Sequence, residues 1–181
     1  MELKDSATKE NLLRAFAGES QARNRYTFSA SLARKKGLHV IEAVFLYTAD
    51  QEKEHAEIFY DHLKKAGCEN VTITGANYPV DLAEDPAEML ELARNHEMDE
   101  FGDVYPAFAD KAEEEGFADV ARHFRQIAAI EKVHADRFQR FAKLLRDTIE
   151  EAGINADNLI MDAYIPTTLA FVKTFANGDR D

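Results

Sequence analysis

The sequence is poor in the residues that would place it among disulfide-rich, exported or membrane-spanning proteins. Its single cysteine, Cys68, excludes a disulfide within one chain and any cysteine-based zinc or iron–sulfur site in these residues. No apolar run approaches the ~20 residues that a membrane-spanning helix needs. The N-terminal residues 1–5 (MELKD) lack the apolar core of a signal peptide. We therefore expect a soluble cytoplasmic protein.

Positive charge is also scarce, because 22 Lys and Arg residues stand against 34 Asp and Glu residues. The resulting net charge of −12 argues against nucleic acid or an anionic membrane as a partner. Apolar residues nevertheless make up 45% of the chain, which is typical of a globular protein. A length of 181 residues is enough for one sizeable core.

Helical periodicity and turn residues predict an all-α fold. The first helix follows a cap at Ser6 or Thr8 and ends before Gly37, and the second runs from about Leu38 to Gly67. Residues 68–84 favour extended and turn structure, so we expect a long crossover there. A third helix begins at Asp85 and Pro86, with a kink near Gly102 and Pro106, and a fourth spans about 117–153. We expect one bundle over residues 1–150 and a short helical tail over 151–181.

Two Glu-x-x-His motifs occupy the second and fourth helices, Glu52 with His55 and Glu131 with His134. Residues three apart on a helix share one face, so both side chains of a motif can reach one ion. In each helix the pair lies within the apolar stripe and not on the polar face. A polar pair in a buried stripe requires a compensating partner.

The motifs belong to a repeated helical hairpin that brings acidic residues to one level. Glu19 and Glu52 lie 18 and 15 residues from the Gly37 turn, roughly 27 and 22 Å along their helices. Glu97 and Glu131 lie 19 and 15 residues from the Gly116 turn, roughly 28 and 22 Å away. With Glu100 on the third helix, five carboxylates and two imidazoles are expected to meet in the middle of the bundle.

A buried ion pair with Arg23, which falls in the apolar stripe of the first helix, is the alternative to a metal site. Burying one ion costs several kcal/mol, whereas a whole domain is stable by only about 5–15 kcal/mol. Five buried carboxylates therefore favour a pair of divalent cations over one arginine. Carboxylate and imidazole ligands suit iron or manganese, and zinc would also bind. A Glu from each of two helices and Glu-x-x-His from the other two is the ligand pattern of ferritin-like four-helix bundles.

Four stretches of the chain resemble the rubrerythrin family: Gly18–Tyr26 (GESQARNRY), Gln51–Ala56 (QEKEHA), Tyr105–Ala109 (YPAFA) and Phe124–His134 (FRQIAAIEKVH). The resemblance covers roughly residues 5–146 and implies a non-haem di-iron peroxidase that reduces hydrogen peroxide to water. It includes the second carboxylate of Glu97-x-x-Glu100, which plain ferritins lack.

The resemblance also assigns roles to individual residues. It makes Glu52 and Glu131 bridging ligands, Glu19 a ligand of the first iron, and Glu97 and His134 ligands of the second. The first iron would exchange His55 for Glu100 as the pair is oxidised. Tyr26 and Tyr105 would hydrogen-bond ligand carboxylates. The remaining histidines are expected at the surface: His39, His62, His96 and His123.

The chain departs from the family pattern after residue 150, where a typical rubrerythrin carries a rubredoxin-like domain with four cysteines. No cysteine follows Cys68, so we expect electrons from an external donor such as a rubredoxin-type protein. Dioxygen is the alternative substrate to hydrogen peroxide. Ferritin-like iron oxidation and storage, a dimanganese catalase-like activity and a metal-free interaction module are the alternative functions. Molecular mass, metal analysis and oxygen evolution would distinguish them.

The tail carries many apolar residues between 158 and 175, more than a solvated appendage should expose. We therefore expect a homodimer, although the tail can also fold back on its own bundle. The long crossover would permit the two chains to exchange hairpins. A monomeric mass by light scattering would contradict the dimer.

Overall fold

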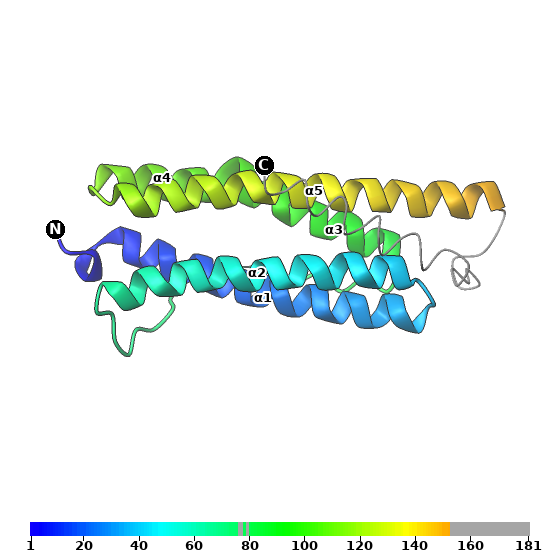
Figure 1. The fold of residues 1–181 in the computed structure, drawn as a ribbon, viewed down its shortest axis with the longest axis horizontal. Helices are drawn as coiled ribbons and strands as arrows, with labels where there is room; N and C mark the ends of the chain where they lie inside the picture. Colours follow the sequence, from blue (N-terminus) through cyan, green and yellow to red (C-terminus); the bar gives the residue numbers. More distant parts are fainter. Residues whose placement is uncertain (76–77, 79, 153–181) are drawn as a thin grey trace.

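The computed structural model describes residues 1–75, 78 and 80–152 (Figure 1). Most of the predicted tail, residues 153–181, lies outside this part of the chain. The described residues form an all-helical bundle, which confirms the predicted fold class. None of their helices is both long enough and apolar enough to cross a membrane.

The elements follow the predicted order along the chain. A short 3₁₀ turn, η1 (Leu3–Asp5), precedes α1 (Ala7–Lys35), and α2 (His39–Lys65) completes the first hairpin. The second hairpin consists of α3 (Pro86–Asp99), a π-helical segment η2 (Glu100–Val104), α4 (Tyr105–Glu114) and α5 (Ala118–Ala152). Figure 1 shows α1 beside α2 and, across the bundle, α3 and α4 beside α5.

Each hairpin turns at a glycine in the left-handed region, as the sequence predicts. Gly37 has a φ of 73°, and the next amide, of Leu38, donates to the carbonyl of Ala33 at 2.9 Å. Gly116 has a φ of 88°, and the amide of Phe117 donates to the carbonyl of Ala112 at 2.8 Å. Both are helix C-terminal motifs in which glycine avoids the strain of a side chain. The position of each turn determines which residues of the two helices in a hairpin lie at the same height along the bundle.

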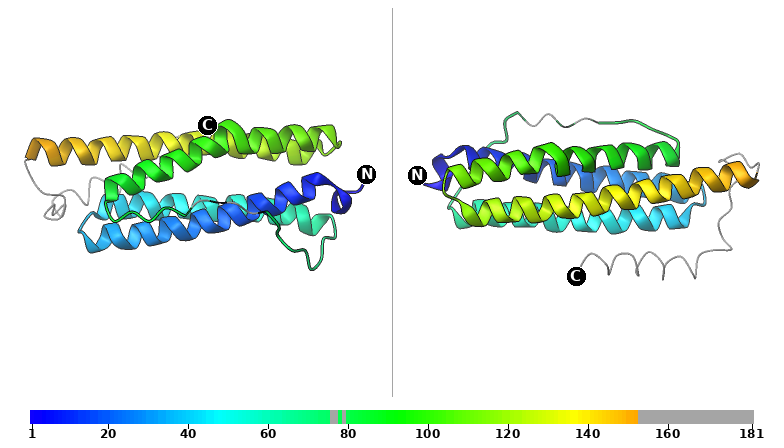
Figure 2. Two further views of the ribbon diagram at one scale, coloured as in Figure 1. Left: turned by 180° about the vertical axis from the view of Figure 1, so that it is seen from behind. Right: turned by 90° about the horizontal axis from the view of Figure 1, so that it is seen from above.

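The third helical rod changes direction at η2, where the sequence predicts a kink (Figure 2). A π-helical segment inserts an additional residue into the helical repeat, which shifts the inward-facing positions that follow. Regular α-helical spacing after Glu97 and Glu100 would place Val104 on the same buried stripe, and the π-helical segment prevents this. Tyr105 is the buried residue instead, whereas Val104 is only partly buried.

The crossover from Cys68 to Glu84 contains neither helix nor strand among its described residues, as predicted. One of these residues, Tyr78, lies against α1, where its hydroxyl donates to the carbonyl of Arg14 at 2.6 Å; Figure 2 shows the crossover from two sides. At its far end Asp85 caps α3 by accepting from the amide of Glu88 at 2.8 Å. The crossover therefore reaches the second hairpin across the outer surface of the first.

The apolar core is divided into two clusters by a polar layer. One cluster, near the Gly37 turn, contains Tyr26, Phe45 and Phe138. The other, near the Gly116 turn, contains Phe59, Tyr105 and Phe124. The acidic and histidine side chains predicted to meet at mid-bundle lie between these clusters, and they are buried.

Candidate metal centre

Every helical rod contributes to the polar layer. Glu19 lies on α1, Glu97 and Glu100 on α3 and η2, and each Glu-x-x-His motif on its own helix. The four glutamates Glu19, Glu52, Glu97 and Glu131 are 1% exposed or less, and Glu100 is 8% exposed. The burial of all five carboxylates agrees with the predicted depth match, but Glu100 belongs to neither of the two groups of potential ligands among the described residues.

The side chains form two groups, and the atoms of each group lie within 4.8 Å of one another. One group consists of Glu19, Glu52, His55 and Glu131, and the other of Glu52, Glu97, Glu131 and His134. Glu52 and Glu131 belong to both groups. Two carboxylates shared by two adjacent groups are in the position of bridges between two ions.

In each shared carboxylate, one oxygen lies near His55 and the other lies near His134. The Nδ1 atom of His55 lies 3.1 Å from Oε2 of Glu52 and 2.9 Å from Oε1 of Glu131. The Nδ1 atom of His134 lies 3.1 Å from Oε1 of Glu52 and 2.8 Å from Oε2 of Glu131. Each bridging carboxylate thus presents one oxygen to each histidine.

The unshared carboxylates complete the two groups from the sides. Oε1 of Glu19 lies 3.8 Å from Nδ1 of His55, and Oε2 of Glu97 lies 3.6 Å from Nδ1 of His134. The two imidazole rings are stacked, with centroids 5.6 Å apart and planes inclined by 17°. The arrangement is close to symmetric about the two bridging glutamates.

Many polar atoms in this layer are buried without a hydrogen-bond partner among the described residues. They are Oε2 of Glu19, both carboxylate oxygens of Glu52 and of Glu131, Oε2 of Glu97, Nδ1 of His55, and both ring nitrogens of His134. Buried polar atoms are normally paired, because an unpaired one costs about 1–3 kcal/mol. These atoms converge and are of the types that bind iron or manganese, so the residues present fit a pair of metal ions.

The burial of so many ionisable groups shifts their pKa values. Burial, together with the charge of Glu131, raises the pKa of Glu19 to about 8. Burial and the neighbouring carboxylates raise the pKa values of Glu97 and Glu100 well above the usual range. Burial opposes protonation of His55, but the carboxylate of Glu131 raises its pKa well above the ordinary value. Glu19, Glu97, Glu100 and the two imidazoles therefore favour their protonated forms without metal ions, whereas, despite burial, the nearby imidazoles lower the pKa values of Glu52 and Glu131.

Two tyrosines hydrogen-bond the unshared carboxylates, in agreement with the sequence-based expectation. Tyr26 donates its hydroxyl to Oε1 of Glu97, and Tyr105 donates to Oε1 of Glu19. Burial, followed by the neighbouring carboxylates, raises the pKa of both phenols well above the ordinary value. Both tyrosines therefore remain protonated donors that orient Glu97 and Glu19.

The ion-pair alternative with Arg23 is wrong, because Arg23 is exposed and Ala22 takes the inward position on α1. The sequence analysis missed another cation, Arg137, which is buried on α5 one turn after His134. Its guanidinium donates to the hydroxyl of Thr48 at 3.0 Å and to Oε1 of Gln51 at 2.8 Å. Its position three residues after His134 is the signal that would have identified it.

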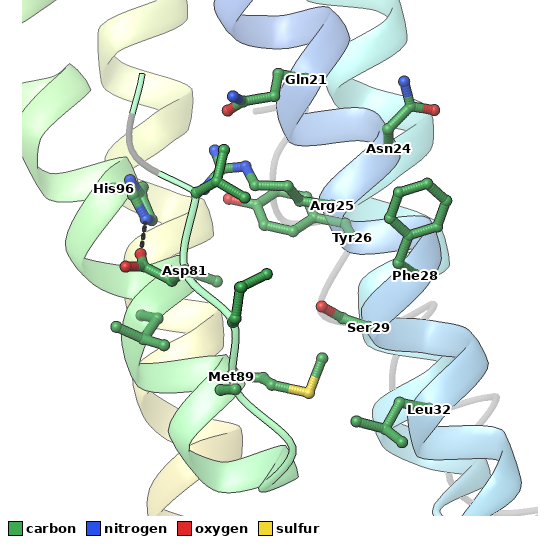
Figure 3. A pocket seen from close by; sticks show the side chains of 15 residues that line it. Gln21, Asn24, Arg25, Tyr26, Phe28, Ser29, Leu32, Asp81, Met89 and His96 are labelled. Carbon is green, nitrogen blue, oxygen red and sulfur yellow. Dashed lines mark hydrogen bonds and ion pairs between the residues drawn. The ribbon is translucent and has the colours of Figure 1, made fainter. Parts of the chain in front are cut away.

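A cavity of about 410 Å³ lies on the other side of Tyr26, between α1, α3 and the crossover (Figure 3). Gln21 and Arg25 line it, and Nε2 of His96 forms a hydrogen bond with Oδ2 of Asp81 at 2.5 Å. Tyr26 forms part of its wall and separates it from Glu97. The cavity therefore reaches a supporting tyrosine but not a candidate ligand.

Comparison with known proteins agrees with the geometry. The sequence model of a family described as rubrerythrin matches residues 10–174. A rubrerythrin of Clostridium perfringens is 47% identical over 145 residues, which cover 80% of this chain and 74% of the relative. A rubrerythrin of Porphyromonas gingivalis is 49% identical over 136 residues, covering 75% of this chain and 66% of the relative. The chain thus spans about two-thirds to three-quarters of the length of these relatives.

A solved structure of nigerythrin, described as fully reduced and all ferrous, has a similar fold. Its TM-score is 0.65 at 32% sequence identity, and the similarity covers 77% of this chain and 70% of nigerythrin. The similarity supports a ferritin-like bundle, as predicted from the repeated hairpins.

Proposed function

Because this chain belongs to the rubrerythrin family, we propose that it is a non-haem di-iron peroxidase that reduces hydrogen peroxide to water. The family is a di-iron family, and the buried Glu and His groups could hold two metal ions. The observation that carries the proposal is the pair of metal-binding groups that share Glu52 and Glu131.

We assign the ligands from the positions of the side chains. Glu52 and Glu131 would bridge the ions, with Glu19 and His55 on one and Glu97 and His134 on the other. A bound ferrous pair would supply the two electrons that break the O–O bond of hydrogen peroxide, which takes up two protons and leaves as two water molecules. Glu100 would act as the additional ligand that replaces His55 in the oxidised state.

The surrounding residues prepare the site in three ways. Tyr26 and Tyr105 hold Glu97 and Glu19 in place through their hydroxyls. The aromatic clusters on both sides of the polar layer exclude water from it. Glu100 is the most exposed of the candidate ligands, and it belongs to the π-helical segment η2. A π-helical segment is a frequent feature of functional sites in helices.

The source of electrons is the part of the reaction that these residues do not supply. We propose a donor outside them, such as a rubredoxin-type protein, because the 181 residues contain one cysteine and a rubredoxin-type iron site uses four. Oxidation of a reduced rubredoxin-type protein on addition of peroxide, followed by visible absorbance, would demonstrate the complete cycle. No oxidation above the rate without the enzyme would exclude this donor.

The test of the function is anaerobic loading with ferrous iron, followed by rapid mixing with hydrogen peroxide. We expect two iron ions per chain and rapid oxidation of both, without release of dioxygen. Glu131→Ala should lose paired occupancy because it removes a bridge, whereas Glu54→Ala, an exposed glutamate on α2, should behave as wild type.

Other outcomes would point to other functions. Evolution of dioxygen from peroxide would indicate a catalase-like reaction, and a large iron-filled shell would indicate storage. Two iron ions that do not react with peroxide would overturn the peroxidase proposal.

A further inference from the structure

Gly18 lies in the middle of α1, one residue before Glu19, and the side chain of Tyr78 packs directly on it. A Cβ atom at position 18 would lie 2.6 Å from Cζ of Tyr78 and 2.7 Å from its Cε1 and Oη. Such contacts are too short for any side chain to occupy this position without moving the ring. Glycine is a poor helix former compared with alanine, and the close approach of Tyr78 explains its presence here.

Two hydrogen bonds hold the crossover against α1, and the first comes from Tyr78. Its hydroxyl donates to the carbonyl of Arg14 at 2.6 Å. The Nε atom of Arg14 in turn donates to the carbonyl of Thr74 at 3.5 Å. The crossover therefore packs on one turn of α1 that ends next to Glu19. The phenol ring of Tyr78 contacts this turn at Gly18, and its hydroxyl contacts it at Arg14.

Tyr78 is also close to the candidate metal centre. Burial, followed by the charges of Glu100 and Glu19, raises its pKa. Glu100 is 8% exposed and is the most accessible of the candidate ligands, of which the next, His55, is 4% exposed. The remaining access from solvent to the carboxylates is therefore on the Glu100 side, and Tyr78 is the crossover residue at that side.

The cavity in Figure 3 does not offer a second route. Tyr26 forms part of its wall, no candidate ligand among the described residues lines it, and Glu97, which accepts a hydrogen bond from Tyr26, is 1% exposed. We propose that the ring of Tyr78 shields the Glu100 side of the metal centre and determines the size of the hydroperoxide that reaches it. The proposal rests on the proposed peroxidase function, which it refines with a specificity-determining residue.

Tyr78→Ala removes the shield, and Tyr78→Phe keeps the ring but loses the hydrogen bond to Arg14. Gly18→Ala leaves Tyr78 in the chain but displaces its ring, and it improves the helix propensity of α1. Tyr60→Ala is the matched control, because Tyr60 is an exposed tyrosine on α2. Metal content and thermal unfolding of each variant establish that it is folded and loaded.

Two measurements test the proposal on the iron-loaded full chain. The first is the ratio of kcat/KM for tert-butyl hydroperoxide to that for hydrogen peroxide, and the second is the rate at which a ferrous chelator removes iron under anaerobic conditions. In Tyr78→Ala and Gly18→Ala we expect both to rise by about tenfold or more, a change large enough to separate from assay variation. Tyr60→Ala should leave both unchanged, and Tyr78→Phe, which keeps the ring, should change them less than Tyr78→Ala does.

The double variant Gly18→Ala/Tyr78→Ala should equal Tyr78→Ala, because the added methyl group acts only through the ring. If Tyr78→Ala changes neither the ratio nor the rate of iron removal, the proposal is overturned. If the wild-type protein reduces no hydroperoxide at all, the peroxidase function fails, and the rate of iron removal still decides whether Tyr78 shields the centre.

Discussion

Glu100 is the residue that distinguishes this polar layer from a symmetric one. The hairpin repeat pairs it with Ala22, so the two halves of the bundle supply unequal numbers of carboxylates. Burial and the charge of Glu19 raise its pKa well above the usual range, and it is more exposed than the carboxylates around it. A carboxylate in this position can compensate the positive charge gained when two metal ions are oxidised.

We expect Glu100→Ala to retain two iron ions but to be oxidised by hydrogen peroxide about 10–100-fold more slowly, the range typical of residues that support a metal site. The physical reason is the loss of an anionic ligand that favours the ferric state. Stopped-flow mixing after metal analysis measures the effect, and Asp99→Ala, an exposed neighbour in the chain, is the control. Wild-type oxidation in a fully loaded Glu100→Ala protein would contradict the switching role.

At the scale of the helices, α2 and α5 are joined by a second histidine pair near the Gly116 turn. Nε2 of His62 lies 2.7 Å from Nδ1 of His123, and both rings are partly buried. The sequence analysis treats these residues as separate surface histidines, and the structure corrects this. Burial and the charge of His123 lower the pKa of His62, and burial and Arg122 lower that of His123.

This pair predicts a loss of stability in mild acid. A histidine whose pKa in the folded protein lies below its usual value of 6.5 stabilises the fold above that pH. The contribution decreases as the pH falls below 6.5 toward the lowered pKa, because the unfolded chain binds the proton more readily. The double variant His62→Gln/His123→Gln should therefore show a smaller decrease in Tm between about pH 7 and 5.

Thermal unfolding of the metal-loaded proteins across this pH range measures the difference. His39→Gln, at the opposite turn of the same helix α2, is the control and should follow the wild type. Equal slopes in the wild type and in the double variant would show that the pair does not contribute to the pH dependence.

At the scale of the whole molecule, the polar layer crosses a core that is otherwise apolar. The two clusters on either side bury their aromatic side chains fully, so the carboxylates between them have little access to water. Cations at the centre would neutralise carboxylates from all the helical rods at once. Metal binding and the stability of the bundle are therefore expected to be coupled.

Removal of the metal ions should lower the Tm of the protein by about 6–20 °C. Leaving a buried charge without its partner costs about 3–5 kcal/mol, and about 1 kcal/mol changes the Tm of a chain of this length by about 2–4 °C. Calorimetry of the protein before and after chelation measures the change. Reloading with zinc should restore the Tm, because it supplies the charge without redox chemistry, whereas an unchanged Tm after chelation would contradict the coupling.

The sequence by itself determined the four helical rods, the two glycine turns and the Glu and His side chains that meet in the candidate metal centre. Glu-x-x-His spacing and the distances to Gly37 and Gly116 depend only on helix geometry, which is local and regular. For the same reason the caps at Ser6 and Asp85 were predictable from a few neighbouring residues. The expectations for the tail concern residues outside the described part of the chain, and they stay predictions.

Tertiary structure decided the contacts that join distant segments. His62 contacts His123, which lies 61 residues further along the sequence, and Tyr78 contacts Arg14, which lies 64 residues before it. Because of the π-helical segment, Tyr105 and not Val104 lies on the buried face of its helix. Helix packing also leaves Arg23 exposed and buries Arg137. Local periodicity cannot predict such choices, because they depend on which side chains of other helices fill the same space.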